Sequence, residues 1–342
     1  MAFLRETGIL ITARIRPCAN DCQFCLLYDR TTDIVPVDRC VSIVEKFLDY
    51  GERCSLIVKQ WFGNAYDYNL EDFRKLFGLF VRNGLGDDGA QDFRYLMVGG
   101  LPFMGEESAR RWIRERIEVG CGYAAGTYAG PPEVHDELFS KKGHFAFQRG
   151  FQKIASEEGL KLMEKVIMLV PYLGHLEEIL AHLDIAGPCE DRRLILMSYS
   201  GRGRAFEAFR PTRDDLLVLP AGILKLFQQE LDEWKTESQW AEEIGRSGEE
   251  GYEDWLPLRL TERNLESIEN QSCTEILDRL RAKTKARYAP LPGALELAKK
   301  YCDSKSLRLY KSRSEVECLW LDRFGAKNPE VGFDGSLPRF NW

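Results

Sequence analysis

Three closely spaced cysteines near the start of the chain are the residues whose types and spacing best fit a chemical role. Cys18, Cys22 and Cys25 lie in the run Arg-Pro-Cys-Ala-Asn-Asp-Cys-Gln-Phe-Cys over residues 16–25, a C-x3-C-x2-C spacing with aromatic Phe24 before the third thiol. Cysteine thiolates are the protein ligands of iron–sulfur clusters. Three thiolates can hold three irons of a four-iron cubane, which leaves one iron open to bind and activate a small molecule.

Other uses of these cysteines fit the sequence less well. Zinc prefers four nitrogen or sulfur ligands, and the next candidates along the chain, Cys40, Cys54 and His135, are not close in sequence. Disulfide frameworks are typical of short secreted chains, whereas this chain has 342 residues and residues 1–8 do not resemble a signal peptide. A chance grouping of three buried structural thiols is the remaining alternative.

The cysteine spacing and Phe24 resemble the signature of the radical S-adenosylmethionine (radical SAM) superfamily. The resemblance implies a [4Fe–4S] cluster held by Cys18, Cys22 and Cys25, with SAM chelating the open iron through its amino and carboxylate groups. It further implies that one electron from the cluster cleaves SAM to methionine and a 5′-deoxyadenosyl radical, which takes hydrogen from a substrate. An electron donor such as flavodoxin or ferredoxin is the partner that this chemistry requires.

A second stretch, residues 126–136, resembles the end of strand four in radical SAM enzymes related to the SPASM and twitch groups. Those enzymes commonly show Ser-Leu-Asp-Gly-Pro and a later His-Asp. Thr127 stands at the Ser position, which implies contact with the SAM ribose or carboxylate, while Ala129 replaces the Asp and loses its contact. Arg149 is the first candidate and Lys141 the second to pair with the SAM carboxylate; a solvated surface cation is the alternative for each.

Gly63, Asn64, Ser198 and His135 are further candidates for contact with SAM or with a metal. The superfamily usually has a Gly-Gly-Glu element after strand two that receives the SAM amine, and Gly63 and Asn64 stand there. Asn64 offers a carbonyl acceptor without charge, and an ordinary Gly-Asn turn is the alternative. Ser198, at the end of the sixth predicted strand, fits either a contact with the adenine of SAM or a place in the protein core. His135 fits a loop or capping residue better than a metal ligand.

The C-terminal third carries only three cysteines, widely spaced: Cys273, Cys302 and Cys318. SPASM enzymes carry about seven cysteines there for extra clusters, so the sequence predicts a single cluster. A lone cysteine can instead give a hydrogen atom to a substrate radical, and Cys302 and Cys318 are the candidates for that catalytic role. The alternative is that both are buried hydrophobic residues, as most free cysteines are.

Strand-like and helix-like stretches alternate over the first 200 residues, which predicts βαβ units and a parallel sheet. The predicted strands cover residues 8–15, 55–59, 93–98, 123–128, 166–170 and 194–199. The predicted helices cover residues 37–50, 70–81, 106–117, 145–158 and 176–183. The cysteine run directly follows the first strand, and in α/β barrels the active site lies on the loops after the strands.

The sequence therefore predicts an α/β fold, with a partial (β/α)6 TIM-like barrel in residues 1–210 and a mainly helical C-terminal extension, residues 211–342, that covers the barrel. The radical SAM core that the resemblance implies has this architecture. Within the extension we expect helices in residues 216–240, 265–285 and 293–301, a polar linker at 245–251, a short strand at 307–310 and a loop-like tail at 332–342.

Composition narrows the function classes. The net charge is −7 without a polybasic block, which argues against a nucleic-acid substrate. No apolar run is long enough to span a bilayer. Ten cysteines without an export signal fit the cytoplasm, where thiols stay reduced.

Three functional hypotheses follow. The first is a radical SAM enzyme acting on a peptide or small molecule, with a preference for peptide epimerisation or crosslinking. The stretch 126–136 resembles enzymes that modify ribosomal peptides or sugar-like metabolites and does not choose between them. The second is a radical SAM enzyme acting on a sugar or nucleoside metabolite. The third, of another class, is a non-catalytic iron–sulfur or zinc protein.

Overall fold

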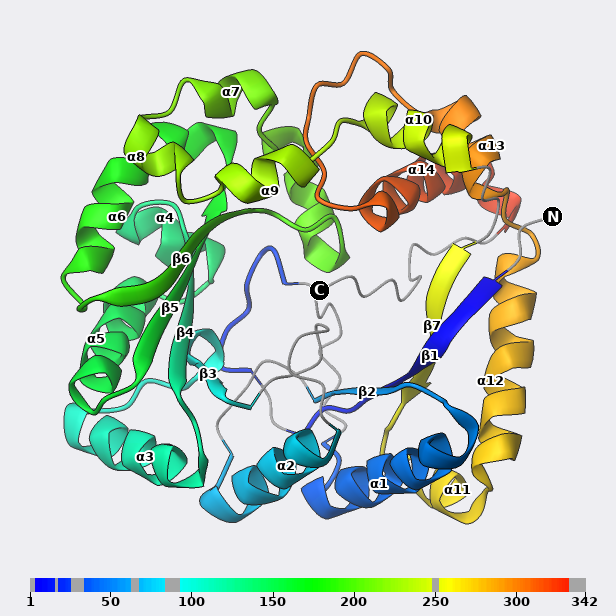
Figure 1. Cartoon of the computed structure of the whole chain (residues 1–342), viewed down its shortest axis with the longest axis horizontal. Coiled ribbons are helices and arrows are strands. Elements are labelled where there is room, and N and C mark those ends of the chain that lie inside the picture. Colours follow the sequence, from blue (N-terminus) through cyan, green and yellow to red (C-terminus); the bar gives the residue numbers. More distant parts are fainter. Residues whose placement is uncertain are drawn as a thin grey trace.

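The strands of the computed structural model form two parallel sheets, and the structure describes residues 4–15, 18–25, 34–62, 68–83, 93–247 and 252–331 (Figure 1). The first sheet has the order β2-β1-β7, with β1 Leu4–Thr12, β2 Val58–Trp61 and β7 Tyr252–Arg259. The second has the order β3-β4-β5-β6, with β3 Tyr95–Met97, β4 Tyr123–Ala129, β5 Lys161–Met168 and β6 Cys189–Leu196. Every pairing is parallel, so the carboxyl ends of the strands within each sheet share one edge.

Helices cover the outside of both sheets, as Figure 1 shows. They are α1 Val37–Cys54, α2 Leu70–Asn83, α3 Glu106–Val119, α4 Pro132–Leu138, α5 His144–Glu157 and α6 Leu176–Asp184. The structure confirms the predicted helices, and a strand overlaps each of the six predicted strand positions. Helix α4 falls in a stretch that the sequence suggested to be a turn and loop. It begins at a proline, a residue that favours the first helical position because its φ is already helical.

Strand β7 was not anticipated, because the stretch after residue 245 was expected to be a linker followed by helices. Its residues pair in parallel with β1 from Leu4–Tyr252 to Thr12–Arg259. The segment contains Pro257 and acidic residues, which weaken a strand pattern. Proline lacks the N–H that a central strand needs, but an edge strand tolerates it, and β7 is at the edge of its sheet.

The rest of the C-terminal part is helical, with short helices first. They are α7 Arg213–Leu217, α8 Ala221–Leu224, α9 Gln228–Glu233, α10 Glu237–Ser247, α11 Leu265–Asn270, α12 Cys273–Tyr288, α13 Ala294–Tyr301 and α14 Arg313–Lys327. Helix α14 was not predicted. The strand expected at residues 307–310 consists only of isolated bridges, from Arg308 to Thr212 and from Tyr310 to Lys235. The division at residue 210 stays a prediction.

One apolar core runs beneath both sheets. It includes Ile9 and Ile11 of β1, Val58 of β2, Leu96 of β3 and Ala124 of β4, all at most 3% exposed. In the described part of the chain β2 and β3 are not hydrogen-bonded to each other, so the strands make two sheets that share a core, and a continuous partial barrel stays a prediction. Of the described helices, none is both long and apolar enough to cross a membrane.

The two faces of the second sheet differ in their neighbours. The even-numbered residues of β4 face helix α5, because a Cβ atom at Gly126 would lie 3.0 Å from side-chain nitrogens of both Gln148 and Gln152 on that helix. The even-numbered residues Val166 and Leu194 pack with helix α6. Because strand side chains alternate, the odd-numbered residues of β4, β5 and β6 lie on the opposite face, called the inner face below, which looks toward the first sheet (Figure 1).

Candidate functional site

The described part of the cysteine loop, residues 18–25, is fastened to three segments that follow or flank the second sheet. The Ala19 N–H donates to Gly100 O after β3 at 3.3 Å, and the Gln23 N–H donates to Leu138 O at the end of α4 at 2.8 Å. The carbonyl oxygen of Cys25 accepts from the Arg202 N–H, beyond β6, at 3.0 Å. The loop that follows β1 therefore lies on the carboxyl rim of the second sheet, where parallel sheets place their sites.

Phe24 and Cys22 hold the loop to that rim by apolar contact. Both pack against a cluster that contains Ala129 of β4, Ile167 of β5 and Met197 just beyond β6. The ring of Phe24 meets the ring of Phe139 edge to face, with 5.0 Å between centroids. These strand residues are odd-numbered, so the loop covers the rim of the inner face.

The three thiols lie close enough to influence one another. Cys18 is exposed, whereas Cys22 and Cys25 are half-buried. Burial raises the pKa of Cys22 far above its ordinary value, Cys18 and Cys25 raise it further, and the cation Arg202 lowers it. Three thiolates here would repel one another unless a positive centre sat among them, which is what a metal cluster supplies. Among the described residues, no three His, Cys, Asp or Glu side chains are gathered as they would be around a metal ion, so the case for a cluster rests on the type and sequence spacing of the cysteines.

Arg202 is a site residue that the sequence analysis missed. Besides its backbone bond to Cys25, its Nη1 donates to Cys22 O at 3.2 Å and pairs with the Asp21 carboxylate. Arg202 lies in the 3₁₀ segment Gly201–Phe209 after β6, where a Cβ on Gly203 would lie 2.3 Å from Ser198 O. The flanking glycines, Gly201 with φ of 50° and Gly203 with no room for a side chain, were the available signal.

Replacing Arg202 by glutamine is expected to loosen the cysteine loop without unfolding the protein. The variant loses the ion pair to Asp21 and the side-chain bond to Cys22 O but keeps the backbone bond to Cys25. After anaerobic reconstitution with iron and sulfide, we expect the bound iron to be lost several-fold faster to a chelator than from the parent. Arg204→Gln is the matched control, because Arg204 lies in the same segment but pairs with Asp322 at 3.0 Å. Equal iron loss from R202Q and R204Q would contradict the role given to Arg202.

Two buried histidines form a hydrogen-bonded relay between the ends of β3 and β4. The Ala129 N–H donates to His135 Nδ1 at 3.3 Å, His135 Nε2 lies 2.8 Å from His144 Nδ1, and His144 Nε2 lies 3.1 Å from Gly99 O. The backbone N–H of Ala129 can only donate, so His135 carries its proton on Nε2 and donates to His144. His144 then donates from Nε2 to Gly99 O, and both rings are neutral.

Asn20 connects the cysteine loop to this relay. Its Nδ2 donates to Gly99 O, the same carbonyl oxygen that accepts from His144 Nε2. Asn20 lies between Cys18 and Cys22, so the relay positions the loop from the side opposite Arg202. The expectation that His135 is a capping or loop residue rather than a metal ligand agrees with its bond from Ala129, although it lies on α4 and is fully buried.

Burial makes the relay sensitive to acid. Burial lowers the pKa of His144 to about 4 and that of His135 well below its usual range. The unfolded chain binds these protons below about pH 6.5, while the folded chain does not bind them until the pH reaches its lowered pKa values. The neutral histidines therefore stabilise the folded state fully above pH 6.5, and this contribution is lost as the pH falls toward 4. For His144 the loss in the free energy of unfolding is on the order of 3 kcal/mol.

Urea unfolding of the metal-free protein between pH 7.5 and 4.5 measures this loss. We expect His144→Gln to flatten the fall in the free energy of unfolding over that range. His175→Gln is the control, because the His175 side chain is 53% exposed. A parent-like slope in H144Q would contradict the burial argument.

The structure places the residues proposed to contact SAM at different distances from the loop. Lys141 lies near Cys18 and Cys22, which raise its pKa, although burial is the larger effect and lowers it. Its Nζ donates to Leu101 O at 3.2 Å and lies 4.1 Å from the centroid of the Phe103 ring. Arg149 is half-buried on α5, on the outer side of the sheet. Of the two proposed SAM-carboxylate partners, Lys141 and not the first candidate Arg149 is therefore near the cysteines.

Two other candidates lie on the second sheet and two lie outside the described residues. Thr127 is half-buried on β4 and, being odd-numbered, lies on the inner face below the rim. Ser198 is half-buried beyond β6, with its carbonyl against Gly203. Gly63 and Asn64 fall among the residues that the structure does not describe, so their proposed contact with the SAM amine stays a prediction.

The cysteines proposed as hydrogen donors pack in another part of the molecule. Cys318 of α14 is 5% exposed in an apolar cluster with Trp320 and Leu297, and Cys302 packs against the same cluster. Burial raises the pKa of Cys302 to about 11. The structure does not bring either thiol to the cysteine loop, and their catalytic role stays a prediction.

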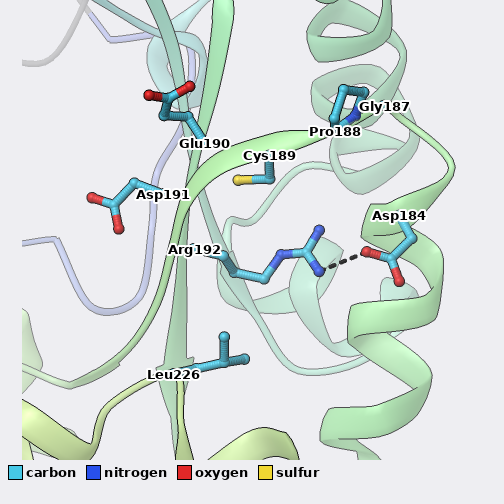
Figure 2. A pocket seen from close by; sticks show the side chains of 8 residues that line it. All are labelled: Asp184, Gly187, Pro188, Cys189, Glu190, Asp191, Arg192 and Leu226. Atoms are coloured by element: carbon cyan, nitrogen blue, oxygen red, sulfur yellow. Dashed lines mark hydrogen bonds and ion pairs between the residues drawn. The ribbon is translucent and has the colours of Figure 1, made fainter.

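A surface groove of about 660 Å³ lies apart from the cysteine loop. It is lined by residues around the start of β6, among them Cys189, Glu190 and Arg192, whose guanidinium pairs with Asp184 at 2.7 Å (Figure 2). Strand β6 begins at Cys189 and the cysteine loop contacts residues beyond its far end. The groove is therefore at the opposite edge of the sheet from the candidate site.

Comparisons with known proteins give structural likeness alone. No protein-family model and no curated protein matches the sequence. Native anSMEcpe with bound AdoMet and Cp18Cys peptide is similar over 95% of this chain and 98% of its own, at 11% identity and a TM-score of 0.47. Streptococcus suis SuiB bound to precursor peptide SuiA is similar over 76% of this chain, at 11% identity and a TM-score of 0.41.

A third similar structure is the coproporphyrinogen III oxidase HemN from Escherichia coli, described as a radical SAM enzyme. It matches 67% of this chain at 12% identity and a TM-score of 0.41. This chain spans about half the length of SuiB and of HemN, 49% and 54% respectively. Because these TM-scores are below 0.5, the similarity does not identify the chemistry of this chain.

Proposed function

We propose that this protein is a radical SAM enzyme whose single [4Fe–4S] cluster is held by Cys18, Cys22 and Cys25. The observation that carries the proposal is the position of the C-x3-C-x2-C loop: it lies on the carboxyl rim of a parallel sheet, and Cys18 and Cys25 are near enough to Cys22 to raise its pKa. When bound, such a cluster supplies the electron that cleaves SAM to methionine and a 5′-deoxyadenosyl radical able to take hydrogen from a substrate.

The residues around the loop have positioning roles in this proposal. Arg202 and the His135–His144 relay with Asn20 hold the loop from two sides, so the cysteines keep one orientation. Lys141 places a positive charge beside Cys18 and Cys22, where it can meet the SAM carboxylate. Phe24 and the rim residues exclude water from one side of the loop.

The substrate class that we favour is a peptide, with epimerisation or crosslinking as the reaction. Residues 126–136 resemble enzymes that modify ribosomal peptides or sugar-like metabolites. The inner face of the second sheet is the surface that a substrate would meet below the loop. A sugar or nucleoside metabolite is the alternative substrate, and a flavodoxin or ferredoxin is the proposed electron donor. A non-catalytic iron–sulfur or zinc protein is the alternative of another class.

Anaerobic reconstitution tests the proposed function. We expect about four irons per chain, an electron paramagnetic resonance signal from the reduced cluster that changes on adding SAM, and release of 5′-deoxyadenosine in the presence of dithionite. A signal indifferent to SAM, or zinc bound in place of iron with no SAM cleavage, would support the non-catalytic alternative.

A further inference from the structure

Two lysines of the inner face are placed without matching negative charge. Lys165 of β5 pairs in register with Thr127 of β4 and with Arg193 of β6. Side chains in register on neighbouring strands lie about 5 Å apart on the same face. Lys311, from the segment before α14, is tied to the end of β6: its N–H donates to Glu315 at 3.1 Å, and Glu315 also accepts from the Tyr199 N–H just beyond β6 at 2.9 Å. From there its charge acts on Lys165.

This row lies one layer below the cysteine loop. The rim row consists of Ala129 and Ile167, which are partners in register and contact Phe24 and Cys22 through the apolar cluster. Thr127 and Lys165 are two residues earlier on the same strands, which is about 7 Å deeper at the rise of a strand. A group held by Lys165 would therefore lie under the loop, on the face that the loop covers.

The neighbouring cations are already neutralised, and these two are not. Arg193 pairs with Asp191 at 2.9 Å, and Arg210 pairs with Glu315 at 2.8 Å. Within the described part of the chain, neither the Lys165 nor the Lys311 ammonium has a carboxylate within ion-pair distance. Asp191 and Glu315 also act on Lys165 and Lys311, but each carboxylate is already paired with an arginine, so these four cations and two carboxylates leave an excess of two positive charges.

Lys165 is exposed but lies among other protein groups on the inner face. Its side chain is exposed to water, yet desolvation is the main cause that lowers its pKa, followed by repulsion from Lys311 and Arg193. Burial also lowers the pKa of the half-buried Lys311. Crowded, uncompensated cations are destabilising by themselves, and an anion between them would remove that cost.

We propose that Lys165 and Lys311 together bind an anionic group of the substrate, a carboxylate or a phosphate, in the layer beneath the cysteine loop. That the anion belongs to the substrate rests on the proposed function; the existence of the anion site does not. The site would orient an acidic peptide side chain or terminus, or a phosphorylated metabolite, with its other end toward the cluster loop.

Phosphate titration of the full chain, followed calorimetrically at constant ionic strength with and without the cluster, tests the anion site. We expect Lys165→Met and Lys311→Met each to weaken inorganic phosphate binding at least tenfold and Lys165→Arg to retain it. Lys153→Met, an exposed lysine on α5, is expected to leave it unchanged. Phosphate affinity that is equal in the parent, K165M and K311M would overturn the proposal.

A stability measurement separates binding from a structural role. Removing one of two repelling charges is expected to leave the melting temperature of K165M unchanged or higher, and added phosphate is expected to raise it in the parent but not in the variant. A clearly lower melting temperature in K165M, with no phosphate effect in the parent, would overturn the anion site. Because neither readout needs a cluster, a failure here is distinct from a failure of the radical SAM proposal.

The source of the anion is decided by comparing SAM with its decarboxylated analogue on the cluster-loaded protein. If the anion belongs to the substrate, K165M binds both molecules as the parent does. If K165M loses affinity for SAM by tenfold or more but not for the decarboxylated analogue, the anion is the SAM carboxylate and the substrate assignment is overturned.

Discussion

Replacement of Cys22 by alanine is expected to abolish both the brown colour of the reconstituted protein and the cleavage of SAM. Cys22 is the central thiol of the loop, half-buried against the rim and influenced by both Cys18 and Cys25. Two remaining thiolates cannot hold three corners of a cubane, so the cluster is lost and SAM has no open iron to bind. Iron analysis, the visible spectrum and 5′-deoxyadenosine release measure the effect, which should exceed a hundredfold in cleavage rate.

Cys54→Ala is the matched control for this prediction. Cys54 is an exposed free cysteine at the end of α1, and its thiol donates to Tyr50 O at 3.2 Å. C54A should keep the full iron content and the parent rate. SAM cleavage by C22A at the parent rate would refute the assignment of Cys22 as a ligand, and with it the proposed function.

Arg210→Met is expected to lower the free energy of unfolding by about 3–5 kcal/mol, because it leaves a buried carboxylate without its partner. Arg210 is 2% exposed and donates to Leu309 O at 2.8 Å, to Met197 O at 2.5 Å and to Glu315 at 2.8 Å. Glu315 is 5% exposed and also accepts from the Tyr199 N–H at 2.9 Å. This pair joins the segment after β6 to α14, so denaturant unfolding of the metal-free protein should show the loss.

A double variant distinguishes the buried charge from lost packing. Arg210→Met with Glu315→Gln keeps an acceptor for the Tyr199 N–H but removes the uncompensated charge, so it should be more stable than Arg210→Met alone. Arg246→Met is the surface control, since Arg246 and Glu242 are 77% and 68% exposed, and exposed pairs contribute at most about 1 kcal/mol. A loss below 1 kcal/mol in R210M would contradict the predicted role.

The alternating pattern of the first 200 residues was enough to locate the strands and helices of that part, because both faces of a parallel sheet are covered and its strands carry apolar runs, such as residues 166–168 of β5 and 194–196 of β6. The sequence did not predict strand β7, because its acidic residues and Pro257 do not form a strand pattern. Its partner β1 lies more than 200 positions earlier in the chain. The sequence did not predict helix α14 either, because its residue pattern is not that of a surface helix. It is buried on most sides, including Trp320 and Leu321, so it lacks the single apolar stripe by which a surface helix is recognised.

At the site, the sequence by itself determined the candidate ligands: the types and spacing of Cys18, Cys22 and Cys25 follow from covalent order, because a loop of eight residues keeps its thiols near one another in any fold. Only the tertiary structure decided what surrounds them. Arg202, His144 and Lys141 lie 184, 126 and 123 positions after Cys18 along the chain, and only the fold brings them to the loop. Lys165 is near Lys311 only because β5 and the segment before α14 converge. Such contacts depend on long-range packing and strand register, which local residue patterns do not encode.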